Sequence, residues 1–293
     1  MVQNLVLGLV YGGIYGLLAV GIVLVYRGSR VLNFAQGEMG TFGLYAAWWL
    51  STEQGLPWIV GAAGAVATAT IIGLAFERFI VRPMGDQSRL AVAVATVGLL
   101  LFLLALGFRA FGESPRSVAG PIRGSIEVAG VFVSGTQILS LVITAAIGVA
   151  LAVLLRRTDF GLAVLAAADD PTAVRLVGVP LRRVSAFTWG TGAAISALAV
   201  LLIEPTVGVF APGFASELFV KGLAAALVGG LTSLPGAFVG GLVVGLLEVF
   251  VTDATLTSSL PGIPTLSVFA LILVVLLARP QGLFGATQTR EAA

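Results

Sequence analysis

The sequence has no cysteine and no histidine, a single lysine, and few charged residues of either sign. Without Cys and His, it excludes disulfide bonds, thiolate nucleophiles, Cys or His metal sites, haem ligation and histidine proton relays. The single lysine, Lys221, lies in Val-Lys-Gly, so the chain has no Walker A motif for binding ATP phosphates. These absences predict no cofactor, and we expect no nucleic-acid partner.

Long apolar runs make up most of the sequence. Of the 293 residues, 58% are hydrophobic and 10% are charged, whereas soluble domains carry about 25% charged residues. A membrane-spanning helix needs roughly 20 consecutive apolar residues. The sequence predicts an all-α, polytopic integral membrane protein, with about eight membrane helices in one domain over residues 1–293. The apolar runs cover residues 5–26, 31–50, 57–76, 90–108, 137–155, 184–203, 217–231, 236–251 and 263–278.

Arginines predict the orientation, because positive charge is enriched on the cytoplasmic side of membrane proteins. They gather in two connectors that two predicted spans separate, so both connectors lie on one side, which we assign to the cytoplasm. The 109–136 loop is then extracytoplasmic, and the 156–183 loop and the C-terminal tail are cytoplasmic. The side of the N-terminus depends on whether residues 31–50 cross fully or re-enter, which the sequence leaves open. The arginines are Arg78, Arg82 and Arg89, then Arg156, Arg157, Arg175, Arg182 and Arg183.

Polar groups interrupt the apolar run 31–50. Asn33, Gln36, Gly37 and Glu38 follow one another within a few residues. A carboxylate at bilayer depth normally faces a bundle interior or a water-filled path, and glycine allows close approach. We expect these four residues to line a translocation path. We also expect Glu38 to be buried, with hydrogen bonds from Asn33, Gln36 or the N–H groups of a broken helix end.

A second interruption lies between the short runs 217–231 and 236–251. It contains Gly229, Gly230, Thr232 and Ser233 and carries no charge. A re-entrant hairpin is preferred over two full spans, with the turn inside the membrane region against Asn33–Glu38 and part of the path. For the glycines alone, close helix packing is the preferred interpretation. Glu248 belongs either to a membrane interface or to the path.

The 156–183 connector contains a short predicted helix. Asp170 before Pro171 is a helix start signal, and Gly178 is a stop signal. Ala173, Leu176 and Val177 would share one apolar face, which lies either on lipid or in a groove of a partner. In the 109–136 loop, β-rich residues on both sides of Ala129-Gly130 predict a small hairpin.

Several of these motifs resemble those of the LivH-type permeases of branched-chain amino-acid ABC transporters. The segment 33–38 is similar to the Asn-Phe-Ala-x-Gly-Glu motif of that family, and 229–237 to its Gly-Gly-x-Gly-Ser-x-Pro-Gly-Ala segment, with Thr232 in place of Gly. The region from Ala173 to Val184 resembles its coupling region, with Pro180 in place of Asn. Glu77-Arg78, Arg82-Pro83 and the 279–285 tail match further motifs in the same order.

The resemblance implies a permease without an active site, in the inner membrane of a bacterium. Its partners would be a LivM-like permease, two cytoplasmic ATPase subunits and an extracytoplasmic substrate-binding protein. The coupling contact would involve Asp170, Ala173, Leu176, Val177 and Gly178. Three alternatives stay open: the same transporter class moving urea or short amides, an ion-coupled secondary transporter, and a channel.

Overall fold

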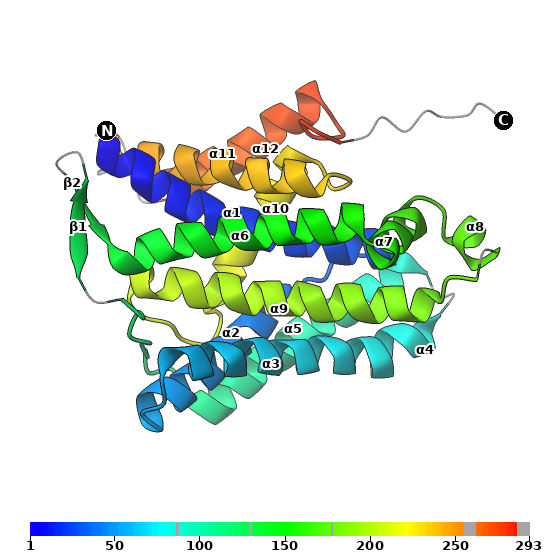
Figure 1. Ribbon diagram of the computed structural model, residues 1–293, viewed down its shortest axis with the longest axis horizontal. Coiled ribbons are helices and arrows are strands. Elements are labelled where there is room, and N and C mark those ends of the chain that lie inside the picture. The colour runs from blue at the N-terminus through cyan, green and yellow to red at the C-terminus, as the bar shows by residue number, and fades with distance from the viewer. Residues whose placement is uncertain (86–87, 123, 129–130, 177, 255–261, 286–293) are drawn as a thin grey trace.

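A computed structural model describes residues 1–85, 88–122, 124–128, 131–176, 178–254 and 262–285 of the chain. Most helices run along one common direction (Figure 1). The strands lie at one end of this bundle, here called the hairpin end, and α7 and α8 lie at the other, the α7 end. The elements are α1 Val2–Ser29, α2 Gln36–Trp48, the π-helix η1 Trp49–Glu53, α3 Trp58–Phe76, the π-helix η2 Glu77–Val81, α4 Arg82–Met84, α5 Arg89–Phe111, β1 Ser125–Val128, β2 Val131–Ser134, α6 Gly135–Arg157, α7 Asp159–Asp169, α8 Pro171–Leu176, α9 Leu181–Val207, α10 Phe214–Gly229, α11 Leu234–Asp253 and α12 Ile263–Ala278.

The helices confirm the predicted fold class, an all-α polytopic membrane protein. Among the described residues, six helical segments are long and apolar enough to cross a membrane, and α12 is a shorter apolar helix. The predicted hairpin also forms: β1 and β2 pair antiparallel, with Ser125 opposite Ser134 and Val128 opposite Val131. The hairpin's Ala129-Gly130 lies outside the described residues.

Glycines bring α1 and α11 into the most extensive helix contact of the fold. Gly12 and Gly16 of α1 lie directly against Gly245 and Gly241 of α11. Lipid gives helices no hydrophobic reason to associate, so small residues that let backbones touch are a main source of attraction between them. The packing interpretation of the α11 glycines is therefore confirmed. α1, buried along most of its length, lies at the centre of the bundle.

The run 31–50 is a broken span rather than a single helix. α1 ends at the α7 end, where Arg30 adopts a left-handed conformation (φ 56°) and donates a hydrogen bond to the Ala168 carbonyl. Residues 31–35 then form no regular helix, and α2 begins beside Gly192, in the middle of α9. Further on, Tyr45 stacks on Phe111 at the far end of α5, with 3.8 Å between ring centroids. The chain thus passes from one end of the bundle to the other, and its N-terminus lies at the hairpin end (Figure 1).

The turn between α10 and α11 lies at the α7 end. Thr232 and Ser233 share a small pocket with Arg27, Arg156 and Asp169. The C-terminal segment covers the end of α10, where the Leu283 and Phe284 amides donate to the carbonyls of Val228 (2.8 Å) and Gly229 (3.1 Å). The expected contact of this turn with Asn33–Glu38 is wrong, because α10 carries the chain away from α2 before it turns.

The glycine contact gives a direct test of the fold. In Gly245→Ala, the new methyl group would lie against the backbone of Gly12, and overpacking of this kind costs about 1–3 kcal/mol. We expect a lower melting temperature of the detergent-purified protein. Gly98→Ala in α5 is the matched control, because no heavy atom lies within 4 Å of the added carbon. Equal melting temperatures for the two variants would contradict the glycine-mediated contact.

Candidate functional site

Glu38 joins the start of α2 to the start of α10. Its side chain is 1% exposed. The Ser216 hydroxyl donates to one carboxylate oxygen at 2.9 Å, and the Gly213 N–H donates to the other at 3.4 Å. Thr41, one turn later on α2, accepts a hydrogen bond from the Ala215 N–H at 3.3 Å. The N-terminal N–H groups of α10 therefore point toward α2, where a carboxylate is favoured by the helix dipole.

The prediction that Glu38 is buried and hydrogen-bonded is confirmed. Its donors are Ser216 and a helix-end N–H, not Asn33 or Gln36. The Asn33 side chain instead contacts its own segment. Its Oδ1 atom accepts a hydrogen bond from the Ala35 N–H at 3.1 Å, and its Nδ2 atom lies 3.6 Å from the Met39 sulfur. Gln36 donates to the Gly192 carbonyl of α9 at 3.4 Å.

The non-helical residues before α2 have hydrogen-bond partners on a neighbouring helix. Thr96 of α5 is fully buried, and its hydroxyl oxygen accepts from the Phe34 N–H at 3.3 Å. The same oxygen lies 2.7 Å from the Ala93 carbonyl and 3.4 Å from the Leu32 carbonyl, within reach of its own hydrogen. Non-helical backbone at membrane depth persists only where protein or water satisfies it, so Thr96 and Asn33 make this break possible.

Two glycines let α2 approach its neighbours. A carbon added at Gly37 would lie 2.6 Å from the Ala215 carbonyl oxygen, and one at Gly40 would lie 2.8 Å from the Ser196 hydroxyl. That hydroxyl donates to the Gln36 carbonyl at 2.7 Å. Gln36, Gly37, Glu38 and Gly40 thus each have a packing or hydrogen-bonding role in holding α2 against α9 and α10.

Two groups of residues were predicted to line the path, one in the segment 33–38 and one in the turn 229–233. The structure brings together the members of the first group but does not place the second beside it. Asn33, Gln36 and Glu38 are each at most 1% exposed, so within this chain they are enclosed rather than open to a passage. Gly229, Gly230, Thr232 and Ser233 lie at the α7 end and do not join them. A role for either group in transport stays a prediction.

Sequence reasoning missed the charged side chains of α10. Lys221 lies 2.9 Å from Glu217 and 2.7 Å from Glu248 of α11. The signal was present: the only lysine of the chain stands in an apolar run four residues after a glutamate, a spacing that places both on one helix face. Reasoning from apolar runs also missed Thr96, because a lone threonine in such a run has no pattern. Among the described residues, no group of three or more acidic side chains is placed to hold a metal ion.

The helix predicted in the 156–183 connector is α8. Asp170 accepts a hydrogen bond from the Ala173 N–H at 3.0 Å, which confirms it as the start signal. Gly178, at φ 84°, follows the end of the helix. Ala173 is exposed and Leu176 is 85% exposed, whereas Val174 packs into the core. Val177 lies outside the described residues.

The sequence profile of one family, described as branched-chain amino acid transport system / permease component, matches residues 4–278. The chain belongs to this family. The permease protein LivH of Escherichia coli K12 is 30% identical to it, over 99% of this chain and 97% of LivH. BraD of Pseudomonas aeruginosa is 29% identical, with the same coverage. A probable LivH of Methanocaldococcus jannaschii is 27% identical over 83% of this chain and 79% of its own length.

A solved structure supports the fold. PsaBC from Streptococcus pneumoniae, in complex with Fab, aligns with a TM-score of 0.53 at 15% identity, over 95% of this chain and 91% of that one. The protein is thus a multi-pass membrane permease subunit, not an enzyme, and its family works with other subunits of ABC transporters.

Replacing Glu38 tests the contact between α2 and α10. Glu38→Ala leaves the Ser216 hydroxyl and the Gly213 N–H without their acceptor, and an unsatisfied buried polar group costs about 1–3 kcal/mol. Glu38→Gln keeps a carbonyl oxygen for Ser216. We expect the melting temperature to fall more for Ala than for Gln, and uptake to fall in the same order. Glu53→Ala, at an exposed position, is the control; if Glu38→Ala melts like this control, the carboxylate is incidental.

Proposed function

We propose that this chain is the LivH-type permease subunit of an ABC importer for branched-chain or related small amino acids. The observation that carries the proposal is the family match over residues 4–278, which includes the broken span, both helices of the α10–α11 pair and the α7–α8 connector. LivH and BraD are named for high-affinity branched-chain amino acid transport. A LivM-like permease, two ATPase subunits and a substrate-binding protein complete the proposed transporter.

The α7 end is the proposed cytoplasmic face, where the ATPase subunits dock. Arginines gather there: Arg27 of α1 lies 3.4 Å from Asp169, Arg30 holds the end of α7, and Arg156 ends α6 nearby. α8 adds an apolar residue, Leu176, that is almost fully exposed beyond the bundle. A side chain of this kind on a short helix suits a groove on a partner protein. The hairpin end is then extracytoplasmic and faces the binding protein.

The complete transporter, reconstituted with its binding protein, tests this function. We expect leucine to stimulate ATP hydrolysis, and urea and acetamide to leave it at the basal rate. Stimulation by urea or acetamide instead of leucine would contradict the proposed substrate class. Uptake that continues without ATPase subunits would contradict the ABC mechanism.

Leu176→Asp is the decisive variant in this assay. A carboxylate buried in an apolar docking face loses its water, so we expect association with the ATPase to weaken by about 2 kcal/mol or more. Copurified ATPase and leucine-stimulated hydrolysis should both fall, while the permease still inserts. Ile126→Asp at the hairpin end, where Ile126 is 59% exposed, should retain its ATPase. Normal copurification of the Leu176 variant would remove α8 from the docking surface.

A further inference from the structure

A charged cluster lies within the bundle on α10 and α11. The Lys221 ammonium contacts Glu248 at 2.7 Å and Glu217 at 2.9 Å. The Lys221 and Glu248 side chains are 11% and 17% exposed, whereas that of Glu217 is 67% exposed. The second carboxylate oxygen of Glu248 is buried, and the Tyr15 hydroxyl of α1 is a further hydrogen-bond partner of this carboxylate. The cluster therefore buries the Lys221–Glu248 pair against α1 and exposes its remaining carboxylate, Glu217.

The cluster lies at a depth where lipid would not tolerate it. α10 starts inside the bundle, because Gly213, just before it, lies beside Leu104, about two turns before the end of α5. The Lys221 ammonium also lies 5.7 Å from the ring of Tyr15, midway along α1. Charged groups at such depth face protein or water rather than acyl chains. The exposed side of Glu217 therefore marks a surface of α10 that does not face lipid.

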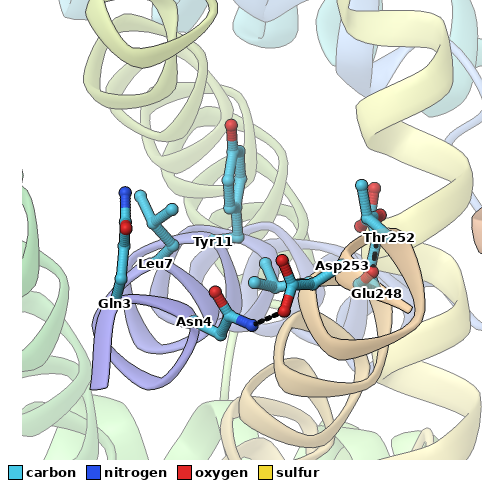
Figure 2. A pocket seen from close by; sticks show the side chains of 8 residues that line it. Gln3, Asn4, Leu7, Tyr11, Glu248, Thr252 and Asp253 are labelled. Atoms are coloured by element: carbon cyan, nitrogen blue, oxygen red, sulfur yellow. Dashed lines mark hydrogen bonds between the residues drawn. The ribbon is translucent and has the colours of Figure 1, made fainter. Parts of the chain in front are cut away.

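A groove connects this cluster with the hairpin end. It has a volume of about 460 Å³ and lies between the start of α1 and the end of α11. Figure 2 shows Gln3, Leu7 and Tyr11 contributed by α1, and Glu248, Thr252 and Asp253 by α11. Asn4 donates to Asp253 at 2.6 Å across the groove. Glu248 belongs to both the groove and the cluster, so the groove leads from the hairpin end toward Lys221.

We propose that this groove is a subsite of the substrate path that binds the ammonium group of a small zwitterionic substrate, an inference that rests on the proposed function. Glu248 and Asp253 line the groove. Lys221 and Glu217 lie next to it, so these four side chains carry three negative charges and one positive charge. A cleft with this excess of negative charge concentrates cations. An ammonium group supplies both a positive charge and three donors for the carboxylate oxygens that line the groove. Urea and neutral amides lack the charge, so the groove favours amino acids over them.

A single thiol in the groove measures its charge selectivity. The chain has no native cysteine, and Leu7→Cys adds one to the groove lining without changing any charged group. The complete transporter is labelled in membrane fragments open to both faces, with a cationic and an anionic methanethiosulfonate reagent. Each rate is divided by the rate of that reagent with free mercaptoethanol. We expect the cationic reagent to be favoured about tenfold, as electrostatic steering allows.

Variants of the cluster assign the selectivity to named charges. Glu248→Gln in the Leu7→Cys background should bring the two normalised rates close to equality, whereas Lys221→Met should raise the preference for the cationic reagent. These opposite changes cannot both follow from a general loss of fold. Leu101→Cys, on an apolar face of α5 and 60% exposed, is the control and should react with neither reagent.

The labelling rates decide whether the groove is an ammonium subsite. Leu7→Cys that is as unreactive as Leu101→Cys would show that the groove is closed to water and would overturn it. Equal normalised rates, or a cationic preference that survives Glu248→Gln, would overturn the ammonium assignment. The labelling requires no transport, whereas leucine-stimulated ATP hydrolysis tests the proposed function, so either can fail without the other.

Discussion

Inside a membrane, every backbone N–H and C=O needs a partner from protein or water, and the structure depends on how that constraint is met between α1 and α2. A continuous helix would satisfy it automatically. Residues 31–35 break the helix. There, the Ala35 N–H donates to the Asn33 side chain and the Phe34 N–H donates to Thr96 of α5. The break lets α2 begin in the middle of the bundle, where Glu38 can accept from the start of α10.

Polar residues at the start of α10 point to two different sides of the helix. On α10, Ser216 turns toward Glu38 and fixes α2, while the adjacent Glu217 pairs with Lys221 on the other side. One side of α10 is therefore enclosed, and on the other side the largely buried Lys221 is paired with the exposed Glu217.

The fold class, the hairpin, the α8 start at Asp170 and the burial of Glu38 could all be predicted from the sequence, because each rests on a local pattern or on the cost of charge in lipid. The donors to Glu38 were predicted only in part, since Ser216 lies far away in sequence. The predicted contact of the 229–236 turn with Asn33–Glu38 was wrong, because run length alone does not show that the start of α10, and not its end, lies beside Glu38. Thr96 had no signal at all: its role exists only once α5 lies beside the break.

The hydroxyl of Thr96 offers the most direct test of this account. Thr96→Val keeps the shape of the side chain but removes the acceptor for the Phe34 N–H, which should destabilise the protein by about 1–3 kcal/mol. Thr96→Ser removes a methyl group and keeps the hydroxyl. In thermal unfolding of the purified permease, Thr96→Val should melt several degrees below Thr96→Ser. A Thr96→Val protein as stable as Thr96→Ser or the unmodified chain would contradict the claim that internal hydrogen bonds hold the broken span.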